Sequence, residues 1–191
     1  MAKTYEHYDN GLVSNFVRLL KDAELLRNHQ RYASAYALAV IGLEEIAKIV
    51  LARWEDAPYK LVNLERRRTQ HLTKQAAIAC LLVAEHIAPS YQAIVENDKT
   101  QMRKWISEPG YEADDIMLWK VHNEEMQHAK HLALYHDSIE GRGNEGREFT
   151  HQDVDALFVY ARRAVLLTGD PIALRIAYCL FQVSKDELSK T

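Results

Sequence analysis

The sequence predicts an all-α fold, a bundle of six or seven helices in a single domain over residues 1–191. Glycine and proline are scarce, at 7 and 4 residues, and this scarcity favours long uninterrupted helices. Apolar residues recur every three or four positions, and no segment shows the alternation of a strand. A chain of this length can bury a core without disulfides or a structural metal.

Two helices are predicted in the first 55 residues. The first covers roughly residues 6–28 and carries an apolar stripe at helical spacing: Leu12, Val13, Phe16, Leu19, Leu20, Ala23 and Leu26. The second runs from about 31 to 55 and ends before Pro58. It contains the most apolar run of the chain, residues 35–51.

The middle of the chain predicts three more helices. One begins at His71 and ends near Pro89, and Pro89 suits the first turn of a further helix to about Ile106. After the break at "SEPGYEADD", a long helix is predicted over roughly 113–138.

The last two helices have clear start signals. They follow residues 139–149, the most glycine-rich stretch and the clearest loop. Thr150, with Asp153 three residues later, predicts a capping box and a helix to Leu167. Asp170 and Pro171 then predict the N-cap and first position of a final helix to about Val183.

Composition limits the classes of function. A formal net charge of −3 gives no global attraction to nucleic acid, so any binding of RNA needs a local basic site. Cys80 and Cys179 lie in separate apolar segments and are interpreted as reduced core residues of a cytoplasmic protein. The N-terminal residues lack the apolar segment of a secretory signal, so none is predicted. The charges within residues 33–51 argue against a membrane span.

Three charges interrupt the apolar run of the second helix: Glu44, Glu45 and Lys48. Glu44 and Lys48 have the i, i+4 spacing of a helix ion pair. Apolar residues surround them in almost every direction, so the charges must find partners on other helices, line a cleft or sit at an interface. Two interpretations stay open, an internal salt bridge that fixes helix register and a polar site in the bundle.

The second candidate cluster is "HNEEMQHAKHLALYHD", residues 122–137. Glu125 and His128 have the spacing of half a di-metal carboxylate site, but no second Glu-x-x-His occurs in the chain. His136-Asp137 is compatible with the metal pair of an HD-type phosphohydrolase, which needs further ligands that the sequence does not single out. No metal or cofactor is therefore predicted.

Metal-free chemistry on RNA is the third interpretation of this segment. Cleavage through the ribose 2′-OH needs a group that titrates near neutral pH and a cation for the phosphate, and His136 and Lys130 supply these types. Other basic residues are candidate phosphate contacts or solvated helix ends: Arg66, Arg67, Arg68, Lys74, Arg162 and Arg163.

Three blocks, in order, resemble the AbiV family of abortive-infection proteins in the HEPN superfamily. They are "LLKDAELLRNHQRYASAYALAVIGLEEIAKIVL", "HLTKQAA" and "AKHLALYHD", and the resemblance covers roughly residues 12–165. It implies a HEPN-like helical bundle, a homodimer and a role in defence against phage. The matching polar positions form the expected site-organising cluster: Glu44, Glu45, Lys48, His71, Lys74, Tyr135 and Asp137.

Many HEPN proteins are metal-independent ribonucleases with an Arg-to-His motif, and the nearest match here is Lys130-x5-His136. Lysine keeps the charge of arginine but lacks its bidentate fork. The resemblance thus implies a phage-defence effector that cleaves RNA with His136 and Lys130 as catalytic residues, with a phage-encoded protein as an expected activator. The rival is a non-catalytic HEPN module that senses or binds a phage protein or nucleotide.

Overall fold

The computed structural model describes residues 3–55, 70–87, 120–121, 125–135 and 148–188, and all six helices with assigned bounds lie in these ranges. They are α1 (Lys3–Asn28), α2 (Tyr32–Glu55), α4 (His71–Ile87), α8 (Glu125–Tyr135), α9 (His151–Leu167) and α10 (Pro171–Leu188). No strand occurs within the described ranges. The all-α prediction is confirmed.

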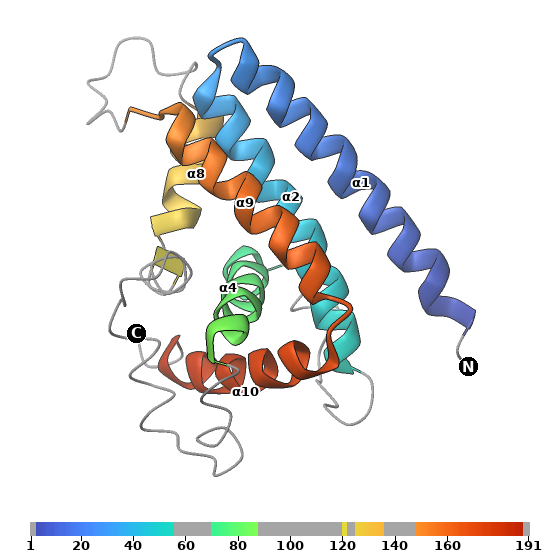
Figure 1. Ribbon diagram of the computed structural model, residues 1–191. Helices are drawn as coiled ribbons and strands as arrows, with labels where there is room; N and C mark the ends of the chain where they lie inside the picture. Colours follow the sequence, from blue (N-terminus) through green and yellow to red (C-terminus); the bar gives the residue numbers. More distant parts are fainter. Residues whose placement is uncertain (1–2, 56–69, 88–119, 122–124, 136–147, 189–191) are drawn as a thin grey trace.

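Helices α1 and α2 form an antiparallel hairpin (Figure 1). The turn between them places Gln30 in the left-handed region, with φ of 59°, and the N–H of Arg31 donates to the carbonyl of Leu26 at 2.9 Å. A left-handed residue followed by such a bond is a common way to end a helix, because it satisfies carbonyls of the last turn.

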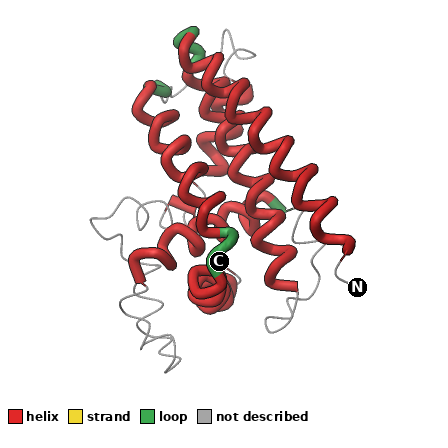
Figure 2. Tube along the Cα trace, turned by 45° about the vertical axis from the view of Figure 1, so that its right-hand side comes forward, coloured by secondary structure: helices red, strands yellow, loops and turns green. Residues whose placement is uncertain are grey.

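Helix α2 is the central helix of the bundle. It packs against α1, α4, α8 and α9, and Figures 1 and 2 show α1, α2 and α9 running side by side. Its buried positions point in nearly every direction, which explains why its apolar residues show no single face. This central position brings any polar group on α2 close to three or four other helices.

Helix α10 turns away from α9 by 114° and lies against α4 across one end of the bundle (Figure 1). Trp54, at the end of α2, is fully buried there and donates from its indole Nε1 to the carbonyl of Leu174 at 3.0 Å. The rings of Tyr178 and Phe181 pack against it. Trp54 therefore fixes the position of α10 on the core.

The predicted caps of the last two helices are confirmed. Thr150 and Asp153 form a complete capping box at the start of α9. Asp170 Oδ1 accepts from the N–H groups of Ile172 and Ala173, at 2.8 and 3.2 Å, at the start of α10. Both caps satisfy N–H groups that have no partner inside their helix.

The stripe predicted on the first helix is only partly buried. Phe16, Leu19 and Ala23 belong to the core, whereas the side chain of Val13 is 37% exposed. Cys80 is buried, Cys179 is half-buried, and no disulfide joins them. The predicted helix at 89–106 and the connection over 56–68 lie outside the described residues.

Within the described ranges, no single helix has both the length and the apolar character needed to cross a membrane. The bent pair of α9 and α10, taken together, meets that requirement by length and composition only.

Candidate functional site

The carboxylate of Glu44 lies in the middle of α2 and is only 2% exposed. A buried carboxylate is strongly disfavoured unless cations and hydrogen-bond donors surround it. The helices that pack on α2 supply these groups. Glu44 is therefore the centre around which the polar residues of the bundle gather.

Four donors from two helices reach the two oxygens of this carboxylate. Oε1 accepts from Lys130 Nζ at 2.7 Å and from Gln75 Nε2 at 3.0 Å. Oε2 lies 2.9 Å from Lys74 Nζ and 2.6 Å from His71 Nδ1. A carboxylate offers about four lone-pair sites, so the acceptor capacity of Glu44 is filled. We call Glu44, His71, Lys74, Gln75 and Lys130 the Glu44 cluster.

The carboxyl group of Glu44 is ionised. Burial, the largest single influence, acts to raise its pKa, but the hydrogen bonds and charges of Lys130 and Lys74 outweigh burial. The pKa of Glu44 therefore lies below its ordinary value.

The ionised carboxylate also sets the tautomer of His71. An acceptor oxygen at 2.6 Å requires a hydrogen on Nδ1, so Nδ1–H donates to Glu44. Lys130 Nζ lies 3.0 Å from the same nitrogen and cannot donate to it in this tautomer. The side chain of His71 is 50% exposed, in contrast to the 2% exposure of its carboxylate partner.

The Glu44 cluster has more positive than negative charge. Lys74 and Lys130 are 5% and 2% exposed, and both ammonium groups have Glu44 as their ion-pair partner within the described residues. One carboxylate thus neutralises one of two buried cations. In a poorly solvated region, the remaining charge favours an anion at the nearby surface.

A chain of amides continues from the Glu44 cluster to the surface of α8. Gln75 Nε2 also lies 3.0 Å from Gln127 Oε1, and Gln127 Nε2 lies 2.7 Å from His131 Nε2. The Oε1 atom of Gln75 is buried and has no hydrogen-bond partner in the described part of the chain. The polar network therefore spans α2, α4 and α8.

Lys48 has a different partner from the one its spacing predicts. Its Nζ lies 2.5 Å from Glu45 Oε1, three residues away, and not against Glu44. Glu44 is instead turned towards α4 and α8, where Lys74 and Lys130 hold it. Glu45 and Lys48 form a separate pair nearer the surface, with side-chain exposures of 11% and 25%.

The structure places the expected site residues unevenly. It brings together Glu44, His71, Lys74 and Lys130 from three helices. Lys130 is buried within this group, although a cation that contacts phosphate directly is expected at the surface. Tyr135 is the last residue of α8, and its side chain lies outside the described part of the structure. His136 and Asp137 lie outside the described residues altogether.

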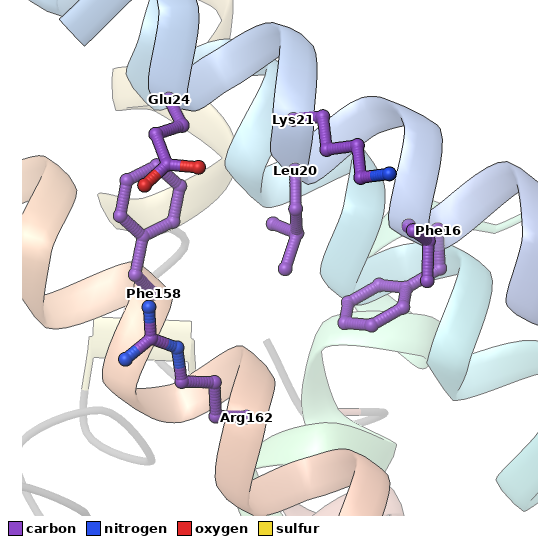
Figure 3. Close-up of a pocket in the computed structure, with 7 residues that line it drawn as sticks. Phe16, Leu20, Lys21, Glu24, Phe158 and Arg162 are labelled. Atoms are coloured by element: carbon purple, nitrogen blue, oxygen red, sulfur yellow. The ribbon is translucent and has the colours of Figure 1, made fainter. Parts of the chain in front are cut away.

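The two arginines of α9 have different surroundings. Arg163 donates to Glu85 of α4 at 2.6 Å, so its charge is paired. Arg162 lines a cavity of about 190 Å³ between α1 and α9, together with Phe16, Val17, Leu20, Lys21, Glu24 and Phe158. Figure 3 shows the side chains of the two helices facing each other across this cavity. Arg66, Arg67 and Arg68 lie outside the described residues.

A family model described as AbiV, in the HEPN superfamily, matches residues 5–157. The chain belongs to the AbiV family. No curated protein and no solved structure matches it. The matched region of this AbiV protein contains every residue of the Glu44 cluster. The HEPN-like helical bundle expected from the three sequence blocks is confirmed by the family match and the fold.

The amide groups of this AbiV protein's network were not predicted from the sequence. Gln75 directly follows Lys74, and Gln127 lies three residues before Lys130, so both sit beside predicted site residues. An uncharged amide carries no pattern that marks it as buried, and only the packing of α4 and α8 on α2 reveals its role. In the described residues, no group of three His, Cys, Asp or Glu side chains is arranged to hold a metal ion.

Proposed function

We propose that this AbiV protein is an abortive-infection effector that cleaves RNA without a metal ion and so stops translation or growth of the infected cell. The Glu44 cluster is the observation that supports this proposal. It combines a half-exposed imidazole with excess buried positive charge. Cleavage through the 2′-OH needs proton transfer near neutral pH and stabilisation of negative charge on the phosphate.

In this proposal, His136 and Lys130 keep the roles expected from the sequence, with one refinement for Lys130. Because its side chain is only 3% exposed, Lys130 acts on the phosphate through its electric field and through its bond to Glu44. His136 directly follows Tyr135, the last residue of α8, and serves as an acid or base. The protein is proposed to work as a cytoplasmic homodimer, with a phage-encoded protein as activator.

The test compares RNA integrity and phage protection in the same set of variants. Purified wild type is incubated with cellular RNA in EDTA, next to His136→Ala and Lys130→Ala. His128→Ala is the matched control, because His128 is an exposed histidine on α8, the helix that carries Lys130. Wild type and the control should cleave RNA and protect cells, and both site variants should lose these properties. Intact RNA with wild type, or full activity of His136→Ala, contradicts the ribonuclease proposal.

The second candidate is a non-catalytic HEPN module that binds a phage protein or a nucleotide. One observation favours it, because a lysine buried against a carboxylate is typical of a structural ion pair. This candidate predicts phage protection by wild type and by His136→Ala, with cellular RNA intact in both. The homodimer is tested by light scattering. A molar mass of a monomer at micromolar concentration contradicts it.

A further inference from the structure

The geometry of the Glu44 cluster leads us to infer that His71 is the general base that removes the proton of the RNA 2′-OH. The inference rests on the proposed ribonuclease function and goes beyond it, because it assigns a second proton-transfer residue in addition to His136. It also places the scissile phosphodiester at the surface where α4 begins, over the buried ends of Lys74 and Lys130.

The first argument is the orientation of the imidazole. Nδ1–H donates to Glu44 at 2.6 Å, so in the neutral ring the lone pair belongs to Nε2. A carboxylate on one nitrogen fixes the tautomer of a histidine and stabilises the imidazolium that forms when the other nitrogen takes a proton. Half of the His71 side chain is exposed, so the ring is accessible to a substrate.

The second argument is the charge around the ring. The ring contacts Glu44 of α2, and Lys130 Nζ of α8 lies 3.0 Å from Nδ1. Lys74 of α4 binds the same oxygen of Glu44, Oε2, that His71 contacts. His131 of α8 is connected to the same carboxylate only through Gln127 and Gln75. The net charge of Glu44 with the two lysines is positive, which favours a phosphate beside the imidazole.

The third argument is the contrast with other histidines. Among those whose side chains the structure describes, His71 is the one hydrogen bonded to a carboxylate. His128 is exposed, and His131 bonds to the amide of Gln127. The ring of His151 lies tilted against the ring of Tyr32, with the centroids 6.3 Å apart. Only His71 has both an orienting acid and an exposed ring in this part of the chain.

The reaction step follows from these positions. Nε2 of His71 takes the proton of the ribose 2′-OH while the 2′-oxygen forms a bond to phosphorus. The bond from phosphorus to the 5′-oxygen breaks, and the leaving oxygen takes a proton from solvent. The products are a 2′,3′-cyclic phosphate and a 5′-hydroxyl, and His71 returns its proton to solvent before the next turnover.

The experiment measures single-turnover cleavage of a short RNA by wild type, His71→Ala and the control His128→Ala, all in EDTA. General base catalysis contributes about 100-fold or more, so His71→Ala should cleave at least about 100-fold more slowly. Added imidazole should restore part of the rate in His71→Ala and leave the control unchanged. Rescue by a diffusible base separates proton transfer from a structural role, and a melting curve checks that the variant is folded.

A second measurement separates failure of this inference from failure of the proposed function. The ring signals of His71 are followed by NMR while an uncleavable oligonucleotide with a 2′-deoxyribose at the scissile position is added. If wild type cleaves RNA and His71→Ala cleaves it at a rate within threefold of wild type, the inference is overturned and the ribonuclease function stands. If wild type cleaves no RNA, the proposed function fails. Unchanged His71 signals overturn the location of the phosphodiester as well, whereas shifted signals support it.

Discussion

Lys130 Nζ donates to Glu44 Oε1 at 2.7 Å, although 86 residues separate the two in the chain. Lys74 reaches the other oxygen of the same carboxylate at 2.9 Å. Three helices, α2, α4 and α8, therefore meet at a single acidic group in the core. The stability of this junction and the chemistry proposed beside it depend on the same charges.

Removing the charge of Glu44 should strongly destabilise the protein. Glu44→Gln keeps the shape of the side chain but removes the carboxylate charge that the buried ammonium groups of Lys74 and Lys130 both contact. Loss of one partner from a buried ion pair costs about 3–5 kcal/mol. Equilibrium unfolding in urea should show a decrease of this size in the free energy of unfolding.

The control for that measurement is Glu85→Gln, which breaks the pair of Glu85 with Arg163. The Glu85 side chain is 48% exposed, so solvent screens the pair and the loss should stay below about 1 kcal/mol. Equal losses in the two variants would mean that the burial of Glu44 adds nothing to its interaction with the lysines.

Glu44 should also make stability depend on pH in acid. Its pKa is lower in the folded protein than its ordinary value of 4.5, so the unfolded chain binds the proton first as the pH falls. The contribution of Glu44 is complete above its ordinary pKa and is lost as the pH falls through the lowered folded value. The difference in unfolding free energy between wild type and Glu44→Gln should therefore be largest near neutral pH and shrink in acid. A difference that grows in acid would reverse the predicted sign.

Lys130→Met should separate stability from activity. Glu44 keeps Lys74, His71 and Gln75 as donors, and an apolar side chain of similar length replaces one buried ammonium. Because Glu44 still has the buried cation of Lys74 as its partner, the melting temperature should change much less than in Glu44→Gln. The rate of RNA cleavage should fall by about 100-fold, because charge that stabilises the phosphate is lost. Cleavage at the wild-type rate would show that this charge takes no part.

Trp54→Phe tests how α10 is held on the core. The substitution removes the hydrogen bond to the carbonyl of Leu174 and leaves a small space beside Tyr178 and Phe181. Loss of one such hydrogen bond costs about 0.5–1.5 kcal/mol. Urea unfolding should show this loss, and Trp54→Ala should show about 3–5 kcal/mol. Wild-type stability of the phenylalanine variant would mean that ring packing alone holds the helix.

Features set by neighbouring residues were predictable from the sequence. The caps at Thr150 and Asp170 depend on groups two or three positions away in the chain, and both predictions are confirmed. The exposure of Val13 was not predictable in this way. An apolar stripe gives the direction of a helix face, but the width of the face that becomes covered depends on which helices pack there.

The partners of the buried charges show the same division. The sequence indicates that Glu44 and Lys48 need partners, but the predicted i, i+4 pair between them is wrong. Lys48 pairs with Glu45, and Glu44 pairs with Lys130. Glu45 is also within reach of Lys48 along the helix, and rotation of α2 in the bundle determines which acid faces inward. The approach of Lys130 to Glu44 depends on tertiary packing, which no local spacing encodes.

The filled carboxylate of Glu44 has a consequence for how this sequence can change over time. Each of its four lone-pair positions has its own donor, so a substitution at 44 alone removes the acceptor that all four donors share. A chain that loses this acid before either lysine therefore passes through an unstable intermediate. Related chains that lack an acid at the position of Glu44 should also have replaced at least one of the two lysines.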